Sequence, residues 1–250
     1  MARIIAVANQ KGGVGKTTTA LNLGVALSRQ QRRVLLVDLD PQAGLTALLG
    51  LDPYQTRRSS YSLLMFPDTT LGRVIVTYGS GLALIPASID LGVAAVRLVQ
   101  GEGALDRLRA TLHESRITFD DILIDTPPGL DVLTAVGLIT ADEVIVPAQC
   151  SRLAILGVRA TYDAIQRISG KSNPGLRLRG VLPTLFDPHL AYSQTVLDEL
   201  RAVLPGQVFE TVIPYDPYAA DAPHSGRPVV DYAPDSPSAL AYLSLAAEIT

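Results

Sequence analysis

Short, strongly apolar runs alternate along this chain with segments whose apolar positions recur at helical spacing. Several of the runs, including IIAVA, VLLVD and DILID, are continuously apolar, which is typical of parallel strands covered by helices on both faces. The pattern predicts strands at Arg3–Asn9, Val34–Asp38, Leu82–Pro86, Asp121–Asp125, Glu143–Pro147, Leu178–Pro183 and Val208–Ile213. It predicts helices at Lys16–Arg29, Leu91–Gln100, Ala104–Ser115, Asp131–Thr140, Ala154–Ile168, Tyr192–Ala202 and Ser238–Glu248.

Strands separated by helix-length segments indicate right-handed β–α–β units and hence an α/β fold with a doubly wound, mostly parallel sheet. No repeat, low-complexity tract or long linker interrupts the chain, so we expect residues 1–250 to form a single domain. In such a sheet, ligands bind beyond the carboxyl ends of the strands. Functional residues are therefore expected just after the runs IIAVA, VLLVD and DILID.

The segment KGGVGKTT follows the first predicted strand and opens the first predicted helix. Its three glycines allow successive backbone N–H groups to wrap a phosphate chain, and the helix N-terminus adds positive potential. Lys16 can reach the β- and γ-phosphates, and the Thr17 hydroxyl can ligate Mg²⁺. Gln10 stands where the general phosphate-loop pattern has its first glycine, and an additional lysine follows it. The predicted nucleotide-binding loop consists of Lys11, Gly12, Gly13, Val14, Gly15, Lys16, Thr17 and Thr18.

Two aspartate motifs, DLDPQ and DTPPG, follow two of the buried strands. Asp125 is the candidate that holds Mg²⁺ directly or through water, and Asp38 is a candidate to support the metal shell. Asp40 is placed to polarise the water that attacks the γ-phosphate. A single aspartate at a strand end commonly caps the turn that follows. Two such motifs at the same edge of the sheet favour metal binding and catalysis instead.

Composition excludes several classes of protein. With 48% apolar and 18% charged residues, the chain is neither disordered nor fibrous. Its single cysteine, Cys150, excludes a disulfide framework and a cysteine-based metal site within one chain. The start MARIIAVANQ lacks the pattern of a signal peptide, and no apolar run is long enough to cross a bilayer. We therefore expect a cytoplasmic protein, associated with the nucleoid if it binds DNA.

Charge is distributed unevenly, although the net charge of −3 gives no overall reason to expect nucleic acid. From Val181 onward there are two basic residues against nine acidic ones. Residues 151–180 hold six basic residues against one acid, and some of the six recur at helix-compatible spacing. Such a segment is either a solvated helix face or a DNA-binding surface, and the candidate residues are Arg152, Arg159, Arg167, Lys171, Arg177 and Arg179.

Taken together, KGGVGKTT, DLDPQ and ILIDTPP resemble the ParA/MinD family of deviant Walker A ATPases, most of all its short ParA (Soj-type) branch. The segments LALIPAS, EVIVPAQ, TVIP and ADAPHSGRP stand in the family's order, so the resemblance covers nearly the whole chain. It implies a P-loop NTPase fold and slow, Mg²⁺-dependent ATP hydrolysis. It also implies an ATP-dependent homodimer, in which Lys11 reaches the partner's phosphates, and a ParB-like or cargo-adaptor protein that stimulates hydrolysis.

The resemblance further implies that Pro214 and Asp216 lie near the adenine, although Asp216 stands where the branch usually has Asn. The turn Thr126–Gly129 would respond to the γ-phosphate. The resemblance thus predicts an ATP-driven switch that segregates or positions a chromosome, a plasmid or a large protein assembly.

This chain departs from the family at the segments that usually carry DNA-binding arginines. His189 and Leu190 occupy one of these segments, and Tyr215 and Tyr218 the other. Two alternatives stay open: DNA binding has moved to residues 151–180, or the switch has lost DNA binding and docks on protein partners. No Lys or Arg follows Arg227, so the basic amphipathic tail of a membrane-targeted relative is missing and no membrane partner is expected.

A biosynthetic ATPase that forms amides or carboxylates its substrate is the rival interpretation, because such enzymes share this loop and fold. It would require a substrate pocket and acid–base residues beside the γ-phosphate, and the sequence offers no convincing set. Lys11 and ADAPHSGRP favour the switch.

Overall fold

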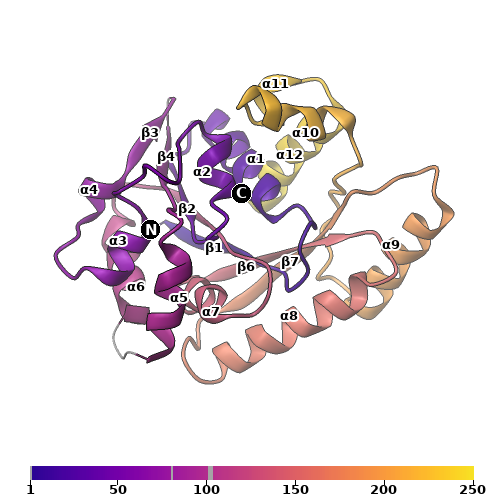
Figure 1. The fold of residues 1–250 in the computed structure, drawn as a ribbon. Helices are drawn as coiled ribbons and strands as arrows, with labels where there is room; N and C mark the ends of the chain where they lie inside the picture. The colour runs from indigo at the N-terminus through magenta and orange to yellow at the C-terminus, as the bar shows by residue number, and fades with distance from the viewer. Residues whose placement is uncertain (1, 80, 101–103) are drawn as a thin grey trace.

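The computed structural model describes residues 2–79, 81–100 and 104–250. Its strands form one seven-stranded sheet in the order β3-β4-β2-β5-β1-β6-β7, in which every pairing is parallel except β3 with β4 (Figure 1). The strands are β1 (Arg3–Val7), β2 (Val34–Asp38), β3 (Val76–Tyr78), β4 (Leu82–Ile85), β5 (Asp121–Asp125), β6 (Glu143–Gln149) and β7 (Arg177–Thr184). The predicted α/β class is confirmed.

The helices divide between the two faces of the sheet (Figure 1). One face is covered by α3 (Ser60–Met65), α5 (Leu91–Gln100), α6 (Ala104–Ser115), α7 (Val132–Thr140), α8 (Ala154–Ser169) and α9 (Ala191–Val203). The other is covered by α1 (Lys16–Arg29), α2 (Gly44–Leu48), α10 (Pro217–Asp221), α11 (Val229–Tyr232) and α12 (Pro237–Ile249). Two short helices, α4 (Leu71–Val74) and the 3₁₀ helix η1 (Ala222–Ser225), complete the described elements.

The continuously apolar strands are explained by these two cores. In β1, Ile4 and Ala6 belong to one core and Ile5 to the other. In β5, Ile122 packs into the first core and Leu123 into the second. Because successive side chains of a strand point to opposite faces, a strand buried on both faces has no polar alternation.

The predicted strand Val208–Ile213 is wrong. Isolated bridges pair Val208 with Val181 and Pro214 with Phe186, and the N–H groups of Phe209 and Ile213 donate to carbonyls of β7, but no continuous ladder joins these contacts. The backbone N–H groups of Glu210 and Thr211 donate instead to the carboxylate of Glu248 in α12, at 2.8 and 3.0 Å. A charged acceptor more than 30 residues away therefore takes the Thr211 N–H, which a continuous ladder with β7 would have used.

The short edge strand β3 and the short helices α2, α3, α4, α10 and α11 were not predicted. Each spans six residues or fewer, so none shows enough periods of an apolar pattern to be recognised. No helix in the described parts of the chain is both long and apolar enough to cross a membrane.

Candidate functional site

The phosphate-loop segment lies between β1 and α1, at the carboxyl edge of the sheet. Gly13 and Gly15 have positive φ angles of 72° and 86°, which side-chain-bearing residues rarely adopt. Gly15 caps α1, and its carbonyl accepts the first helical hydrogen bond from Thr19 at 2.8 Å. The glycines thus fold the chain into a turn whose backbone amides surround the start of the helix.

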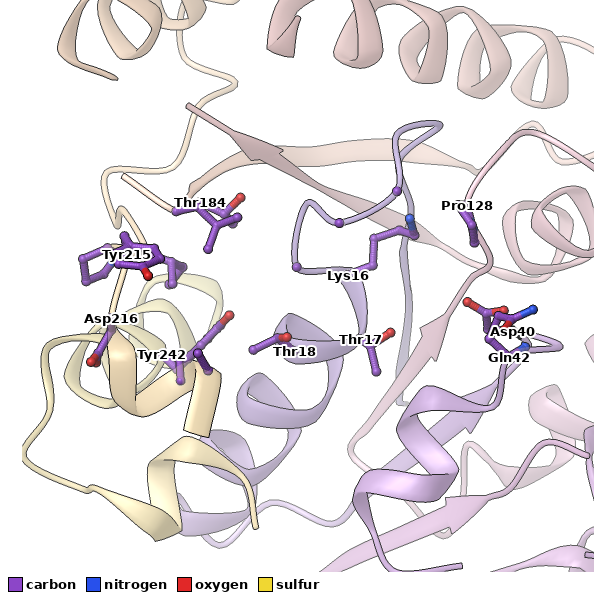
Figure 2. A pocket seen from close by; sticks show the side chains of 18 residues that line it. Lys16, Thr17, Thr18, Asp40, Gln42, Pro128, Thr184, Tyr215, Asp216 and Tyr242 are labelled. Atoms are coloured by element: carbon purple, nitrogen blue, oxygen red, sulfur yellow. Dashed lines mark hydrogen bonds between the residues drawn. The ribbon is translucent and has the colours of Figure 1, made fainter. Parts of the chain in front are cut away.

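A cavity of about 430 Å³ opens over this loop. Figure 2 shows its two ends: Asp40, Gln42 and Pro128 lie on one side of Lys16 and Thr17, whereas Thr184, Tyr215, Asp216 and Tyr242 lie on the other. The first end carries Asp40 beside the Lys16 ammonium, and the second, apart from Asp216, is made of aromatic and hydroxyl side chains. The cavity therefore suits an elongated ligand with a phosphate–metal end and a planar, less polar end.

Asp38 and Asp125 are register partners on the adjacent strands β2 and β5, so both carboxylates emerge at the same edge. Asp38 is fully buried, and its oxygens accept hydrogen bonds from the Thr46 N–H, the Thr46 hydroxyl and the Asp40 N–H at 2.9, 2.6 and 3.0 Å. Burial raises the pKa of Asp38 to about 6 in spite of these bonds. With its oxygens engaged, Asp38 supports α2 and Asp40 rather than facing the cavity.

Asp125 has the opposite environment. It is fully buried, and neither of its carboxylate oxygens has a hydrogen-bond partner among the described residues. Burial first, and the neighbouring Asp38 charge second, raise its pKa well above the ordinary value; the Thr17 hydroxyl and the Lys16 ammonium act in the opposite direction. An unpartnered buried carboxylate is costly unless a cation compensates it, and oxygen ligands suit Mg²⁺. Asp125 and Thr17 therefore fit a magnesium site.

Lys16 is nearly buried, with 7% of its surface exposed. Burial lowers its pKa, while Asp125 and Asp40 act to raise it. Its ammonium donates to the Lys11 carbonyl across the loop, at 3.1 Å. Asp40 lines the cavity and is 9% exposed; burial raises its pKa, and its carboxylate accepts the Gln42 N–H at 2.9 Å. Both charged groups thus lie at the metal end with few protein partners.

Two of the predicted loop residues do not line this cavity. The Val14 side chain is buried, and its carbonyl accepts the Thr184 hydroxyl at 2.9 Å. The Lys11 ammonium lies outside the cavity and donates to the Gln149 side chain and the Ser151 hydroxyl, each at 3.1 Å. Gly12, Gly13, Gly15, Thr17 and Thr18 do line it.

Asp216 lies at the end of the cavity opposite Asp40 (Figure 2), and Pro214, two residues before it, also lines the cavity. The Asp216 carboxylate is committed to the protein: it caps α10 through the Tyr218 N–H and accepts both the N–H and the hydroxyl of Ser238. Burial by itself would raise the pKa of Asp216, but these hydrogen bonds outweigh it and the pKa lies below the ordinary value. An adenine contact from this carboxylate remains a prediction.

Sequence reasoning missed Thr184, Tyr215 and Tyr242 as lining residues. Thr184 ends β7 at the edge where ligands were expected, so its position was a usable signal. Tyr242 is in α12 and is fully buried, with its hydroxyl near that of Thr19. Nothing in the local sequence distinguishes it from an ordinary core residue.

The six candidate DNA-binding residues are not gathered into one patch. Arg152 precedes α8 at the carboxyl edge of the sheet, whereas Arg177 begins β7 at the opposite edge. Sixteen helical residues, about 24 Å, lie between these edges. Arg177 and Arg179 pair with the buried Glu143, at 2.8 and 3.8 Å. The exposed residues without a carboxylate partner in the described structure are Arg152, Arg159, Arg167 and Lys171.

The free energy of unfolding should depend on pH, because burial raises the pKa values of Asp38 and Asp125. Between about pH 4 and 6, folded Asp38 binds a proton that the unfolded residue, with its ordinary pKa, does not. The free energy of unfolding of the ligand-free chain should therefore rise by about 1 kcal/mol from Asp38 alone as the pH falls from 7.5 to 5.5. Urea denaturation at several pH values measures this change.

The matched variant is Asp125→Asn, which removes one of the three raised carboxyl pKa values of the site, those of Asp38, Asp40 and Asp125. In the Asp125→Asn chain, the free energy of unfolding should change less steeply with pH than in the parent chain. His113, whose pKa burial lowers, acts in the opposite direction in both proteins. An equal slope in the two proteins would contradict the assignment.

Comparison with known proteins gives consistent matches. A family model described as an AAA domain matches residues 2–178. The chromosome-partitioning ATPase Soj of Thermus thermophilus is 42% identical over 247 residues, covering 99% of this chain and 95% of the relative. The chromosome partitioning protein ParA of Caulobacter vibrioides is 39% identical over 249 residues, covering 99% of this chain and 93% of that protein.

Among solved structures, cobyrinic acid a,c-diamide synthase from Mycobacterium smegmatis, with bound ADP and magnesium, is 40% identical with a TM-score of 0.85. The match covers 99% of this chain and 93% of that one. A further structure of that protein contains an ATP analogue and magnesium.

Proposed function

This chain belongs to the ParA/MinD family of deviant Walker A ATPases, and on that premise we propose that residues 1–250 form one ATPase domain that acts as a Mg²⁺·ATP-dependent dimerisation switch. The switch positions or segregates a cargo, and slow hydrolysis of ATP to ADP and phosphate sets how long it stays assembled. The observation that carries this proposal is the position of Lys11. Its ammonium lies outside its own chain's cavity, so it supplies charge to a nucleotide only when another copy presents one.

The remaining site residues have distinct roles. Lys16 moves from the Lys11 carbonyl to the phosphates, and Gly12, Gly13 and the other loop residues down to Thr18 contribute their backbone amides. Thr17 and Asp125 hold Mg²⁺, which when bound neutralises phosphate charge. Asp40 orients the attacking water and accepts its proton. Pro214 and the surrounding apolar surface hold the base.

The partner that stimulates hydrolysis is a ParB-like or cargo-adaptor protein. From Val181 onward the chain carries nine acidic and two basic residues, and all of the acidic ones except the buried Asp216 are at least partly exposed, so they complement a basic segment of such a partner. Removing the basic segment from a co-purifying partner should abolish its stimulation of hydrolysis; unchanged stimulation would reject this part of the proposal.

DNA is the track in this proposal, contacted through Arg152, Arg159, Arg167 and Lys171. Arg177 and Arg179 are left out because both guanidinium groups are engaged by the one buried carboxylate of Glu143. Binding that rests on about four phosphate contacts per chain is weak, and its affinity falls with salt less steeply than binding through a larger number of contacts. A gel-shift titration of random duplex DNA at low and moderate salt should show binding with ATP and none with ADP.

The rival, an amide-forming enzyme, is favoured by the similarity to a protein named as a diamide synthase. Amide formation from glutamine requires a reactive nucleophile such as a thiolate. Cys150 does not fit that role, because it is 2% exposed and burial raises the pKa of its thiol to about 11. We therefore place the synthase activity second.

The deciding experiment measures oligomeric state and hydrolysis together. Light scattering with ATP, ADP and no nucleotide should show a dimer with ATP alone, and hydrolysis should respond to macromolecular partners. A chain that stays monomeric with ATP and whose hydrolysis responds to small carboxylic acids and ammonia would be the biosynthetic enzyme instead.

A further inference from the structure

Lys11 is held by two neutral groups at the end of β6. Its ammonium donates to Oε1 of Gln149, in the last position of the strand, and to Oγ of Ser151, two residues further on, both at 3.1 Å. The three side chains are half-buried. No carboxylate pairs with this ammonium in the described part of the chain. The cation is therefore fixed in place by hydrogen bonds to uncharged oxygens.

The main chain beside Lys11 is held separately from its side chain. The Lys11 N–H donates to Oδ1 of Asn9 at 2.9 Å, and the Asn9 side chain donates to the Pro147 carbonyl at 2.7 Å. The Gln10 N–H donates to the Thr161 hydroxyl of α8 at 3.1 Å. The backbone is thus fastened to β6 and α8, and the ammonium can leave Gln149 and Ser151 without rearranging it.

We propose that Gln149 and Ser151 form a holding site for the Lys11 ammonium in the free chain, and that leaving this site sets the threshold for ATP-dependent dimerisation. The inference rests on the proposed function, since it requires Lys11 to act on a second copy. Gln149 and Ser151 are positioning residues: they act through Lys11 and do not line the nucleotide cavity.

The chemistry of the two acceptors explains why the holding site is reversible. A phosphate oxygen carries charge and forms a stronger bond to an ammonium than a neutral amide or hydroxyl oxygen does. It is therefore favourable for the Lys11 ammonium to leave Gln149 and Ser151 and bind the phosphates of a facing nucleotide. Leaving still costs the two hydrogen bonds to these residues. A carboxylate at either position would hold the ammonium more firmly than these neutral oxygens do.

Nucleotide binding also loosens Lys11 from the other side. The Lys16 ammonium donates to the Lys11 carbonyl at 3.1 Å, across the loop. When Lys16 turns to a phosphate, that carbonyl loses its donor. In the chain that has bound ATP, Lys11 then keeps only its hydrogen bonds to Asn9, Gln149 and Ser151.

Two sets of substitutions, expected to shift the dimer dissociation constant in opposite directions, test the proposal. In an Asp40→Ala background, which slows hydrolysis, the double change Gln149→Ala with Ser151→Ala removes the holding site and should lower the dimer dissociation constant with ATP by about tenfold. Gln149→Glu should raise it by about tenfold, because the new carboxylate pairs with the ammonium. Sedimentation equilibrium measures both constants, and a fluorescent ATP analogue measures nucleotide affinity in the dilute monomer, which should stay within twofold.

The matched controls are Gln166→Ala and Gln166→Glu, at an exposed position of helix α8, which follows Ser151; the Gln166 side chain makes no hydrogen bond in the described structure. They should leave the dimer constant unchanged. In a Lys11→Ala chain, the Gln149 and Ser151 changes should have no further effect. The inference would be overturned if the alanine and glutamate changes shifted the dimer dissociation constant in the same direction. It would also be overturned if neither change shifted that constant in a protein that dimerises. Absence of any ATP-dependent dimer in the parent chain would instead overturn the proposed function.

Discussion

The Lys16→Ala chain should remain monomeric at ATP concentrations that convert the parent chain to dimer, and its ATP affinity should fall by about 100-fold. Lys16 provides the positive charge at the centre of the phosphate loop, where a charge-assisted bond to a phosphate is made inside a site that largely excludes water. Alanine removes that bond and leaves Asp125 and Asp40 without their nearest cation.

Folding should survive this change. The Lys16 ammonium makes one hydrogen bond in the described structure, to the Lys11 carbonyl, and burial already disfavours its charged form. Binding of a fluorescent ATP analogue and light scattering with ATP measure the two effects. Arg73→Ala, on the exposed surface of α4, is the control that removes a cation elsewhere and should bind ATP normally. Equal dimerisation of the Lys16→Ala and parent chains would refute the role assigned to Lys16.

The Asp40→Ala chain should show the reverse combination: ATP is bound, the dimer forms, and hydrolysis slows by about 100-fold or more. Asp40 faces the cavity with one hydrogen bond, from the Gln42 N–H, so its loss costs little stability. Removing a buried carboxylate next to the phosphates also removes a repulsion, and nucleotide affinity should not fall.

Single-turnover hydrolysis, with light scattering on the same sample, separates the chemical step from assembly. Asp68→Ala, which removes an exposed carboxylate from a loop, is the control and should hydrolyse ATP at the parent rate. An Asp40→Ala dimer that hydrolyses ATP and dissociates as fast as the parent would show that another group positions the water.

Local sequence determined the phosphate loop and the two aspartate motifs. Each is a strand followed by a short loop, so its chemistry and its place at the sheet edge are encoded within about ten consecutive residues. The doubly wound sheet followed for the same reason, because a strand buried on both faces is continuously apolar and can be recognised alone. The two aspartate motifs lie at the carboxyl ends of their strands. The parallel pairing of β2 with β5, in which Asp38 is opposite Asp125, brings the two motifs together.

Tertiary structure alone decided how the charged groups are used. Lys11 meets Gln149 across 138 residues of sequence, and Arg177 meets Glu143, which removes it from the expected DNA-binding set. Glu248 captures the backbone donors of a segment that reads as a strand. A charge or a backbone N–H binds the strongest acceptor that folding brings within about 3 Å, and that acceptor is chosen by the packing of distant elements, which no local pattern records.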